Sequence, residues 1–141
     1  MLALPDTDML SLLQRKTPAV VRRAESYLAH YGRFSLTELT RYEIERGYRA
    51  VEAHKQLANF REFCADHQVL PLTWPALERA SQIWADLRRA GRLIGEVDIL
   101  TAAIALESRM ALATRNTEHF QRIEGLVVEN WASESQDPTS P

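Results

Sequence analysis

The chain has 141 residues, of which 45% are hydrophobic, and its formal net charge is -2. This length matches one domain with its own core and leaves no room for a separate substrate domain. The charge excludes recognition of nucleic acid through an overall positive surface, so such binding would need local arginines or bound cations. Lysine occurs only at Lys16 and Lys55, and the planar fork of arginine suits phosphate recognition.

The single cysteine, Cys64, excludes an internal disulfide and a cysteine zinc cluster, and it favours a reducing compartment. No apolar run approaches the roughly 20 residues that cross a bilayer, and the amino terminus lacks the basic segment of a signal peptide. We therefore expect a cytoplasmic protein.

Short apolar runs alternate with segments of helical periodicity. After an apolar run that ends at Pro5, helices are expected at about 18–31, 37–47, 50–67, 73–91 and 97–107, and short strands at about 33–36, 69–72, 111–114 and 126–128. Glycine at 32, 47 and 91 marks expected helix ends. The alternation predicts parallel pairing with right-handed crossovers, hence an α/β fold: a three-layer α/β/α sandwich around a mostly parallel sheet.

The apolar spacing also predicts which helix faces are buried. Leu57, Phe60 and Cys64 are expected to point inward, and the helix that begins at Thr73 carries a stripe listed as Leu77, Ala80, Trp84 and Leu87. Residues 1–131 are assigned to the folded domain. The polar composition of 132–141 predicts a disordered tail.

Four acids fall at expected strand ends or helix beginnings: Asp6, Asp8, Glu43 and Asp98. Ligands of open α/β sheets bind at the carboxyl ends of the strands. Clustered carboxylates repel one another, whereas Mg²⁺ or Mn²⁺ would stabilise their ionised form and bind phosphate oxygens. Such an ion lowers the pKa of its bound water and orients the water for attack on phosphorus. The acids together predict a metal-dependent phosphodiesterase site.

Each acid also has an ordinary explanation. Asp6 and Asp8 would cap a helix that begins near Met9, Asp98 would complement a helix dipole, and Glu43 would be an exposed helix residue. His119 is the most site-like of the four histidines, although most histidines in its position lie on the surface.

Several ordered motifs resemble PIN-domain ribonucleases of the VapC toxin type, over residues 2–131. The segments are Leu4-Pro5-Asp6-Thr7-Asp8, Thr37-Glu38-Leu39-Thr40-Arg41-Tyr42-Glu43, Gly95-Glu96-Val97-Asp98, and Ala113-Thr114-Arg115-Asn116. This resemblance departs from the family pattern at Pro5, which has no N–H, at Asp8, where asparagine is common, at Thr37, where serine is common, and at the neutral Asn116.

The resemblance implies a PIN-like fold and an Mg²⁺- or Mn²⁺-dependent endoribonuclease that acts as the toxin of a toxin–antitoxin pair. It makes Asp6, Glu43 and Asp98 the metal ligands and Asn116 a further catalytic residue, with Thr7, Asp8, Thr40 and Thr114 supporting them or the substrate. The implied partners are RNA, a VapB-type antitoxin, operator DNA reached only through that antitoxin, and a second copy of the chain in a homodimer or larger assembly.

Other functions use similar acids. Asp6-Thr7-Asp8 resembles the acid pair of haloacid-dehalogenase-type phosphatases, but that chemistry needs a lysine after a later strand, where neither Lys16 nor Lys55 lies. A receiver domain needs an aspartate after a middle strand, and 69–74 has none. A catalytically silent PIN-like binding module is a further alternative, because fold alone does not establish function.

Overall fold

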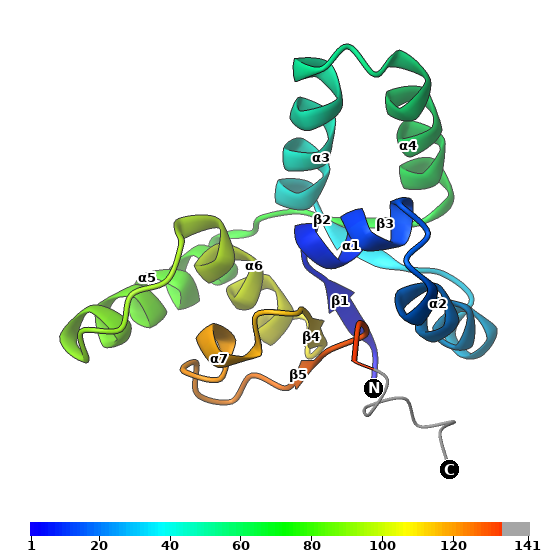
Figure 1. Cartoon of the computed structure of the whole chain (residues 1–141). Coiled ribbons are helices and arrows are strands. Elements are labelled where there is room, and N and C mark those ends of the chain that lie inside the picture. Colours follow the sequence, from blue (N-terminus) through cyan, green and yellow to red (C-terminus); the bar gives the residue numbers. More distant parts are fainter. Residues whose placement is uncertain (134–141) are drawn as a thin grey trace.

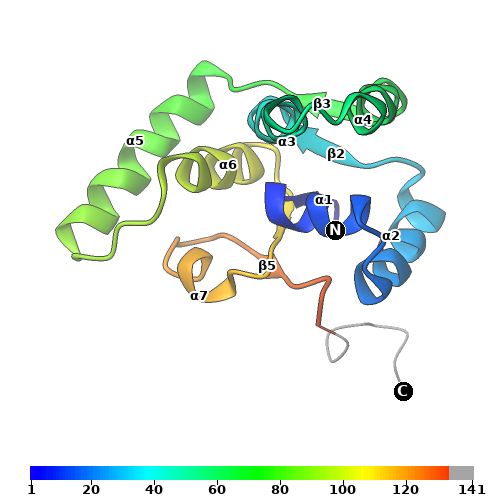
Figure 2. The same ribbon diagram turned by 45° about the horizontal axis from the view of Figure 1, so that its top comes forward.

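The computed structural model describes residues 1–133. Its strands are β1 (Ala3–Pro5), β2 (Ser35–Thr37), β3 (Gln68–Leu70), β4 (Ala111–Ala113) and β5 (Val128–Glu129). Its helices are α1 (Thr7–Gln14), α2 (Pro18–Tyr31), α3 (Glu38–Ala50), α4 (His54–Asp66), α5 (Trp74–Arg89), α6 (Glu96–Glu107) and α7 (Thr117–Phe120). Figures 1 and 2 show α3 and α4 as a hairpin beside β2 and β3, and α5 and α6 together on another side of the molecule.

All strand pairs are parallel, but they form two short sheets, in the orders β1-β4-β5 and β2-β3. β2 lies beside β1 without a hydrogen-bonded ladder. The amide of Asp6 donates to Ala113 and that of Ala111 to Leu2, so even-numbered residues of β1 face β4. Pro5 faces the opposite side, where it has no N–H to offer to β2.

Side chains alternate between two apolar layers on either side of the sheet. Leu4 and Leu112 pack into the core that α5 and α6 cover, whereas Ala3, Ala111 and Ala113 pack against α1 and α2. This alternation is the period-two pattern of a strand buried on both faces. It confirms the predicted three-layer α/β/α architecture.

A group of aromatic rings in mutual contact joins α2 to the residues that pack against it. We call it the aromatic cluster; its members are Tyr27, Tyr31, Phe34, Phe63, His67 and Trp131. The ring of Tyr27 lies 5.7 Å from that of Phe34 and 5.4 Å from that of Trp131, between centroids. The Tyr27 hydroxyl exchanges hydrogen bonds with the backbone of Ala3, at 3.1 Å from its nitrogen and 3.3 Å from its oxygen. The cluster therefore holds the beginning of β1.

Two sequence-based expectations for the helices are wrong. Gly47 does not end α3, which continues to Ala50, because the left-handed position after the helix is taken by Glu52 at φ 54°. The expected single helix over 50–67 is consequently the end of α3, a turn and α4. At this turn the amide of Ala53 donates to the carbonyl of Tyr48.

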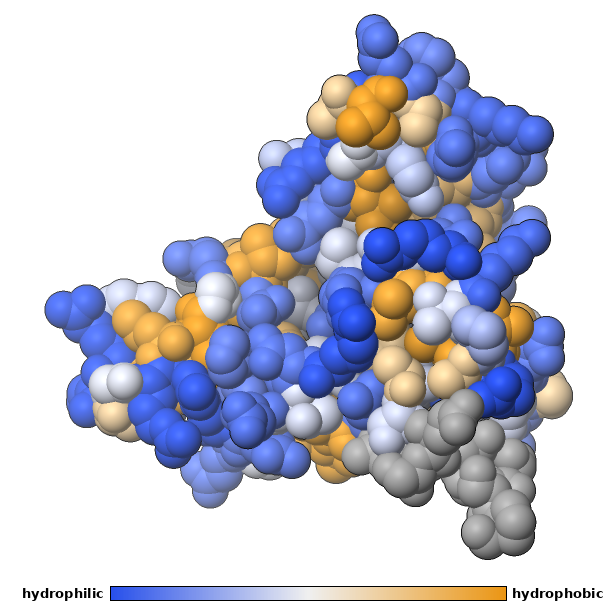
Figure 3. All heavy atoms as spheres, viewed as in Figure 1, coloured by the Kyte–Doolittle hydropathy of each residue, from blue (hydrophilic) through white to orange (hydrophobic). Residues whose placement is uncertain are grey.

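The buried face of α5 also differs from the predicted stripe. Its buried residues are Ala76, Ala80, Ile83 and Leu87. Leu77 and Trp84 are 37% and 38% exposed, because α6 packs against the neighbouring face of the helix. Figure 3 shows hydrophobic groups reaching the surface along α5 and at the outer end of α3 and α4.

The remaining elements appear close to their expected places. β2, β3 and β5 are displaced by one or two residues from the expected ranges. Phe60 and Cys64 are buried as predicted, and Leu57 is half-buried. Within residues 1–133, no helix is both long enough and apolar enough to cross a membrane. The expected disordered tail lies, from residue 134 onward, outside the described residues.

Candidate active site

A cavity of about 560 Å³ opens where β1 and β4 end, beside α3 and the beginning of α6. We call it the acid pocket; its lining residues are Asp6, Thr7, Asp8, Glu43, Asp98, Arg115, Asn116 and Phe120. All four acids predicted from the sequence line it. They come from three separate regions of the chain: Asp6 and Asp8 follow β1, Glu43 lies on α3, and Asp98 lies in the first turn of α6.

Asp6 directly follows β1 and is 8% exposed. One of its carboxylate oxygens, Oδ1, accepts a hydrogen bond of 2.8 Å from the amide of Met9, so Asp6 caps α1. Burial raises the pKa of Asp6 to about 6, although hydrogen bonds from Thr114 and Met9 act in the opposite direction and the charges of Asp8 and Asp98 add to the rise. Asp6 therefore both caps α1 and lines the acid pocket.

Asp98 lies in the first turn of α6, three residues after its N-cap Gly95. Partial burial raises its pKa, the charge of Glu43 raises it further, and His119 lowers it. The buried helix thus presents its acidic N-terminal turn to the pocket while its apolar residues pack in the core. The helix dipole favours an anion at this position.

Glu43 is held by a hydroxyl and a cation. The Thr7 hydroxyl donates to Oε1 of Glu43 at 2.6 Å, and Thr7 Oγ1 also lies 3.0 Å from the hydroxyl of the fully buried Thr40. The guanidinium of Arg46 lies 3.5 Å from the other carboxylate oxygen of Glu43. Thr7 and Thr40 thus connect α1 with α3 at the edge of the pocket, as the expectation of a supporting role requires.

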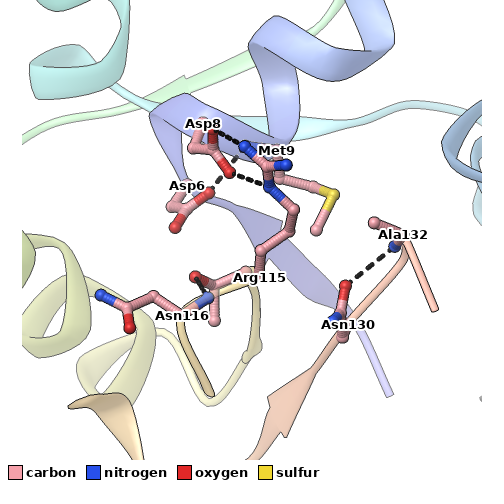
Figure 4. A network of polar contacts seen from close by, with 8 residues as sticks. Asp6, Asp8, Met9, Arg115, Asn116, Asn130 and Ala132 are labelled. Atoms are coloured by element: carbon pink, nitrogen blue, oxygen red, sulfur yellow. Dashed lines mark hydrogen bonds and ion pairs between the residues drawn. The ribbon is translucent and has the colours of Figure 1, made fainter. Parts of the chain in front are cut away.

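Asp8 points to the opposite edge of the pocket. Arg115 donates from Nε to Oδ2 of Asp8 at 2.7 Å and from Nη2 to Oδ1 at 2.8 Å, a two-pronged ion pair between α1 and the end of β4 (Figure 4). Such a pair fixes both groups more firmly than a single contact. Asp8 and Asp6, although two residues apart, therefore have different partners.

Thr114 and Asn116 shape the loop after β4. The Thr114 hydroxyl accepts from the amide of Asn116 at 3.0 Å and bonds to the Asp6 carboxylate. The Asn116 side-chain nitrogen Nδ2 lies 2.6 Å from Nδ1 of His119, which then acts as acceptor. His119 therefore contacts the site through Asn116.

Sequence reasoning gave little weight to two lining residues. Arg115 was quoted only within the segment Ala113-Thr114-Arg115-Asn116, and Phe120 carried no role. The signal for both was position, because both lie in the segment after β4: Arg115 directly precedes Asn116, and Phe120 ends α7.

The acid pocket combines oxygen donors that suit a divalent cation with carboxylates that already have other partners. As placed in residues 1–133, no three His, Cys, Asp or Glu side chains stand where they could hold a metal ion. Glu43 is engaged by Thr7 and Arg46, and Asp8 by Arg115. The donors nevertheless suit Mg²⁺ or Mn²⁺ in kind, because Asp6 and Asp98 are oxygen ligands whose charged forms are disfavoured without a nearby cation.

Comparison with known proteins places the chain in a family. The PIN domain family model matches residues 3–126. The chain is 29% identical to a tRNA(fMet)-specific endonuclease VapC of Shigella flexneri, over 90% of this chain and 96% of that protein. It is 26% identical to ribonuclease VapC1 of Haemophilus influenzae strain R2866, over 93% of this chain and 98% of that protein.

Solved structures agree. A DNA-bound VapBC from Salmonella typhimurium superposes with a TM-score of 0.82 at 26% identity, covering 93% of this chain and 99% of that chain. A VapBC2 from Rickettsia felis bound to a promoter DNA fragment superposes with a TM-score of 0.83 at 20% identity, covering 93% and 99%. The fold and the acid pocket define an α/β domain with a cluster of carboxylates at its strand ends. The chain belongs to the PIN domain family.

Proposed function

We infer that the chain is an endoribonuclease toxin of the VapC type, and we propose that its reaction depends on Mg²⁺ or Mn²⁺. The observation that carries the proposal is the meeting of Asp6, Glu43 and Asp98, from three regions of the chain, in one cavity. The ribonuclease names of the relatives, which match along nearly their whole length, support the same activity.

Asp6, Glu43 and Asp98 would hold the ion. When bound, it would neutralise the substrate phosphate and lower the pKa of an attacking water. Asp6 enters this role in a fixed orientation, because the Met9 amide and Thr114 hold its carboxylate. Thr7 holds Glu43 in the same way from α1. The contact of Arg46 with the other carboxylate oxygen of Glu43, at 3.5 Å, would compete with the ion for that carboxylate.

Asn116 and Thr114 would position the substrate. The Asn116 amide stands on the pocket wall, restrained by His119 on its side chain and by Thr114 on its backbone. A neutral amide can bind a water or a phosphate oxygen without adding to the repulsion among the acids. This supports the assignment of Asn116 to the catalytic group and of Thr114 to its support.

The alternatives fit less well. A haloacid-dehalogenase-type phosphatase would need a lysine in the pocket, yet Lys16 and Lys55 are both outside the lining within residues 1–133. The family match also does not favour that reading. A silent binding module would not need two acids of raised pKa in a cavity.

The partners follow the same class. We propose that a VapB-type antitoxin binds the chain, that operator DNA is reached through this antitoxin, and that the toxin forms a homodimer or a larger assembly, in the cytoplasm. The VapBC complexes among the similar structures, some of them bound to DNA, support an antitoxin partner.

Cleavage of total cellular RNA tests the proposal. Purified protein should cut RNA at discrete positions with Mg²⁺ or Mn²⁺ and should not cut it with EDTA. Asp98→Asn should lower the rate at least about 100-fold, because it removes a charge that contacts the ion, while circular dichroism and Tm show a folded protein. Wild-type turnover in folded Asp98→Asn would contradict the assignment of Asp98. Equal cutting in EDTA would contradict metal dependence.

A further inference from the structure

The acid pocket has an unusual charge balance for a site that binds a polyanion. Four carboxylates line it, and among residues 1–133 Arg115 is the only cationic side chain in its wall. Carboxylates in the same cavity repel the negative charge of a phosphodiester, so each cationic side chain in the wall has a large effect on RNA binding. The role of Arg115 therefore bears directly on how RNA enters.

The Asp8 pair leaves part of the Arg115 guanidinium available. Asp8 accepts one N–H from Nε and one from Nη2. A guanidinium has five N–H donors in a planar fork, so three remain, and no other acceptor for them occurs in the described part of the chain. The side chain of Arg115 is 51% exposed, which leaves these donors accessible to a ligand.

The position of Arg115 matches a reacting phosphate. It immediately follows Thr114, which bonds to Asp6, and it is close enough for the Asp6 charge to act on it. Figure 4 shows the guanidinium beside Asp8 and Asp6, with the edge formed by Nε and Nη2 turned toward Asp8. A phosphate bound in this cavity beside Asp6 would therefore lie next to the Arg115 guanidinium, whose remaining N–H donors are open to solvent.

We propose that Arg115 donates to a non-bridging oxygen of the RNA phosphodiester that is cleaved, and that Asp8 is a positioning residue for Arg115 rather than a metal ligand. This rests on the proposed nuclease function. Arg115 then stabilises negative charge that grows on phosphorus-bound oxygens during attack, and Asp8 fixes the plane of its fork. This role explains why position 8 is aspartate where asparagine is common, because only a carboxylate forms the charged two-pronged pair with arginine.

The chain supplies a matched control in Arg89 and Asp86. This is another exposed Arg–Asp contact, with an N–O distance of 2.8 Å, at the end of α5 and outside the acid pocket. Arg89→Ala and Asp86→Asn make the same chemical changes as Arg115→Ala and Asp8→Asn. They should leave cleavage unchanged.

Cleavage kinetics give the first readout. At saturating Mg²⁺, Arg115→Ala should lower kcat about 100-fold and Arg115→Lys should recover part of it, because lysine restores the charge but not the fork. Asp8→Asn should lower kcat less, by about 10-fold. In the Arg115→Ala background Asp8→Asn should have no further effect, because Asp8 acts through Arg115. Equal kcat for Arg115→Ala and wild type would overturn the proposal, as would independent, multiplying effects of the two changes.

Two measurements do not depend on turnover. The Mg²⁺ concentration that gives half of the maximal increase in Tm should be the same for Asp8→Asn and wild type. A clear increase in that concentration for Asp8→Asn would make Asp8 a metal ligand and overturn its positioning role. Fluorescence anisotropy with a labelled single-stranded RNA of 12 nucleotides, in the non-cleaving Asp98→Asn background with Mg²⁺, should give about 10-fold weaker binding for Arg115→Ala and unchanged binding for Arg89→Ala. Equal Kd values would overturn the phosphate contact.

These readouts separate the two proposals. Wild-type protein that cuts no RNA with either metal would contradict the proposed function, whereas the anisotropy comparison would still decide whether Arg115 contacts RNA. Wild-type cutting with an unaffected Arg115→Ala variant would contradict only the role of Arg115.

Discussion

The two ends of β1 are built on opposite principles. At its beginning, Ala3 exchanges two hydrogen bonds with the Tyr27 hydroxyl inside the aromatic cluster, where polar atoms have partners and rings stack. At its end, Asp6 is a buried carboxylate whose pKa is raised by burial and by neighbouring acids. The contacts at the first end stabilise the fold, whereas the buried carboxylate at the second end destabilises it and lines the site. Stabilising residues and site residues can therefore lie at opposite ends of a strand of three residues.

Truncation of Trp131 should have the largest effect on this comparison. Its ring is 2% exposed and packs against Tyr27 and Phe34. Trp131→Ala should lower the free energy of unfolding by about 3–5 kcal/mol, the range for large aromatic truncations. Urea denaturation measures it, with Trp74→Ala as control, because Trp74 is 70% exposed and should change it by less than about 0.5 kcal/mol. Similar effects of the two changes would mean that the aromatic cluster does not stabilise the fold.

Neutralisation of Asp6 should have an opposite, smaller effect. The pKa of Asp6 in the folded state is about 6 against an ordinary value of 3.8, so the unfolded chain loses its proton first as pH rises. This group therefore lowers stability progressively from about pH 4 to about pH 6, and fully above that. Asp6→Asn, which keeps an oxygen for the Met9 amide, should stabilise the metal-free protein at pH 8 by about 2 kcal/mol and much less at pH 4.

Calorimetry in EDTA and then in Mg²⁺ measures this prediction. Mg²⁺ should raise the Tm of the wild type and leave that of Asp6→Asn nearly unchanged, because the ion binds the native carboxylate. Asp86→Asn, at an exposed position of α5, controls for the loss of one negative charge. A less stable Asp6→Asn at pH 8 without metal would show that the carboxylate is not a source of instability.

A pH dependence in the aromatic cluster should be the smallest of the three effects. The Phe34 amide donates to Nδ1 of His67 at 3.0 Å, which requires that nitrogen to be unprotonated. Burial lowers the pKa of His67 below its ordinary 6.5, so the unfolded chain binds a proton first as pH falls. The stability that this neutral histidine contributes is complete above pH 6.5 and is lost as pH falls below it, by about 1 kcal/mol for the hydrogen bond.

His67→Asn isolates that contribution. Asparagine can accept the same amide hydrogen bond but does not titrate, so between pH 7 and pH 5 the variant should lose less unfolding free energy than the wild type. His54→Asn, at an exposed position at the start of α4, should follow the wild type. Parallel curves for wild type and His67→Asn would contradict the proposed hydrogen-bond switch.

Much of the fold and the identity of the pocket acids could be predicted because they depend on local chemistry. Thr37 and Thr73 cap α3 and α5 through their hydroxyls, at positions visible in the sequence. Residues 99–106 are apolar nearly all round, which is the pattern of a buried helix, and α6 is one. The end of β1 delivers Asp6 to the cavity, and the N-terminal turn of α6 delivers Asp98 to it.

The features that could not be predicted depend on contacts between distant residues. The helix α3 continues past Gly47 to Ala50, because the turn that ends it is formed by Glu52, at positive φ, and by the hydrogen bond from the amide of Ala53. The packing of α6 determines which face of α5 is buried, and the hydrophobicity of Leu77 or Trp84 does not. The pairing of Asp8 with Arg115 joins residues 107 positions apart, and nothing in either local sequence specifies it.

Pro5 has a consequence for how the site is assembled. Within residues 1–133, no backbone hydrogen bond crosses from β1 to β2. The β2-β3 sheet and α3, which carries Glu43, therefore contact the β1-β4-β5 sheet through side chains. Such an interface opens more easily than a ladder of amide hydrogen bonds. The Thr7 hydroxyl, in contact with Thr40 and Glu43, is a polar contact across this interface. The position of Glu43 relative to Asp6 therefore depends on the side chain of Thr7, which directly follows Asp6 in the chain.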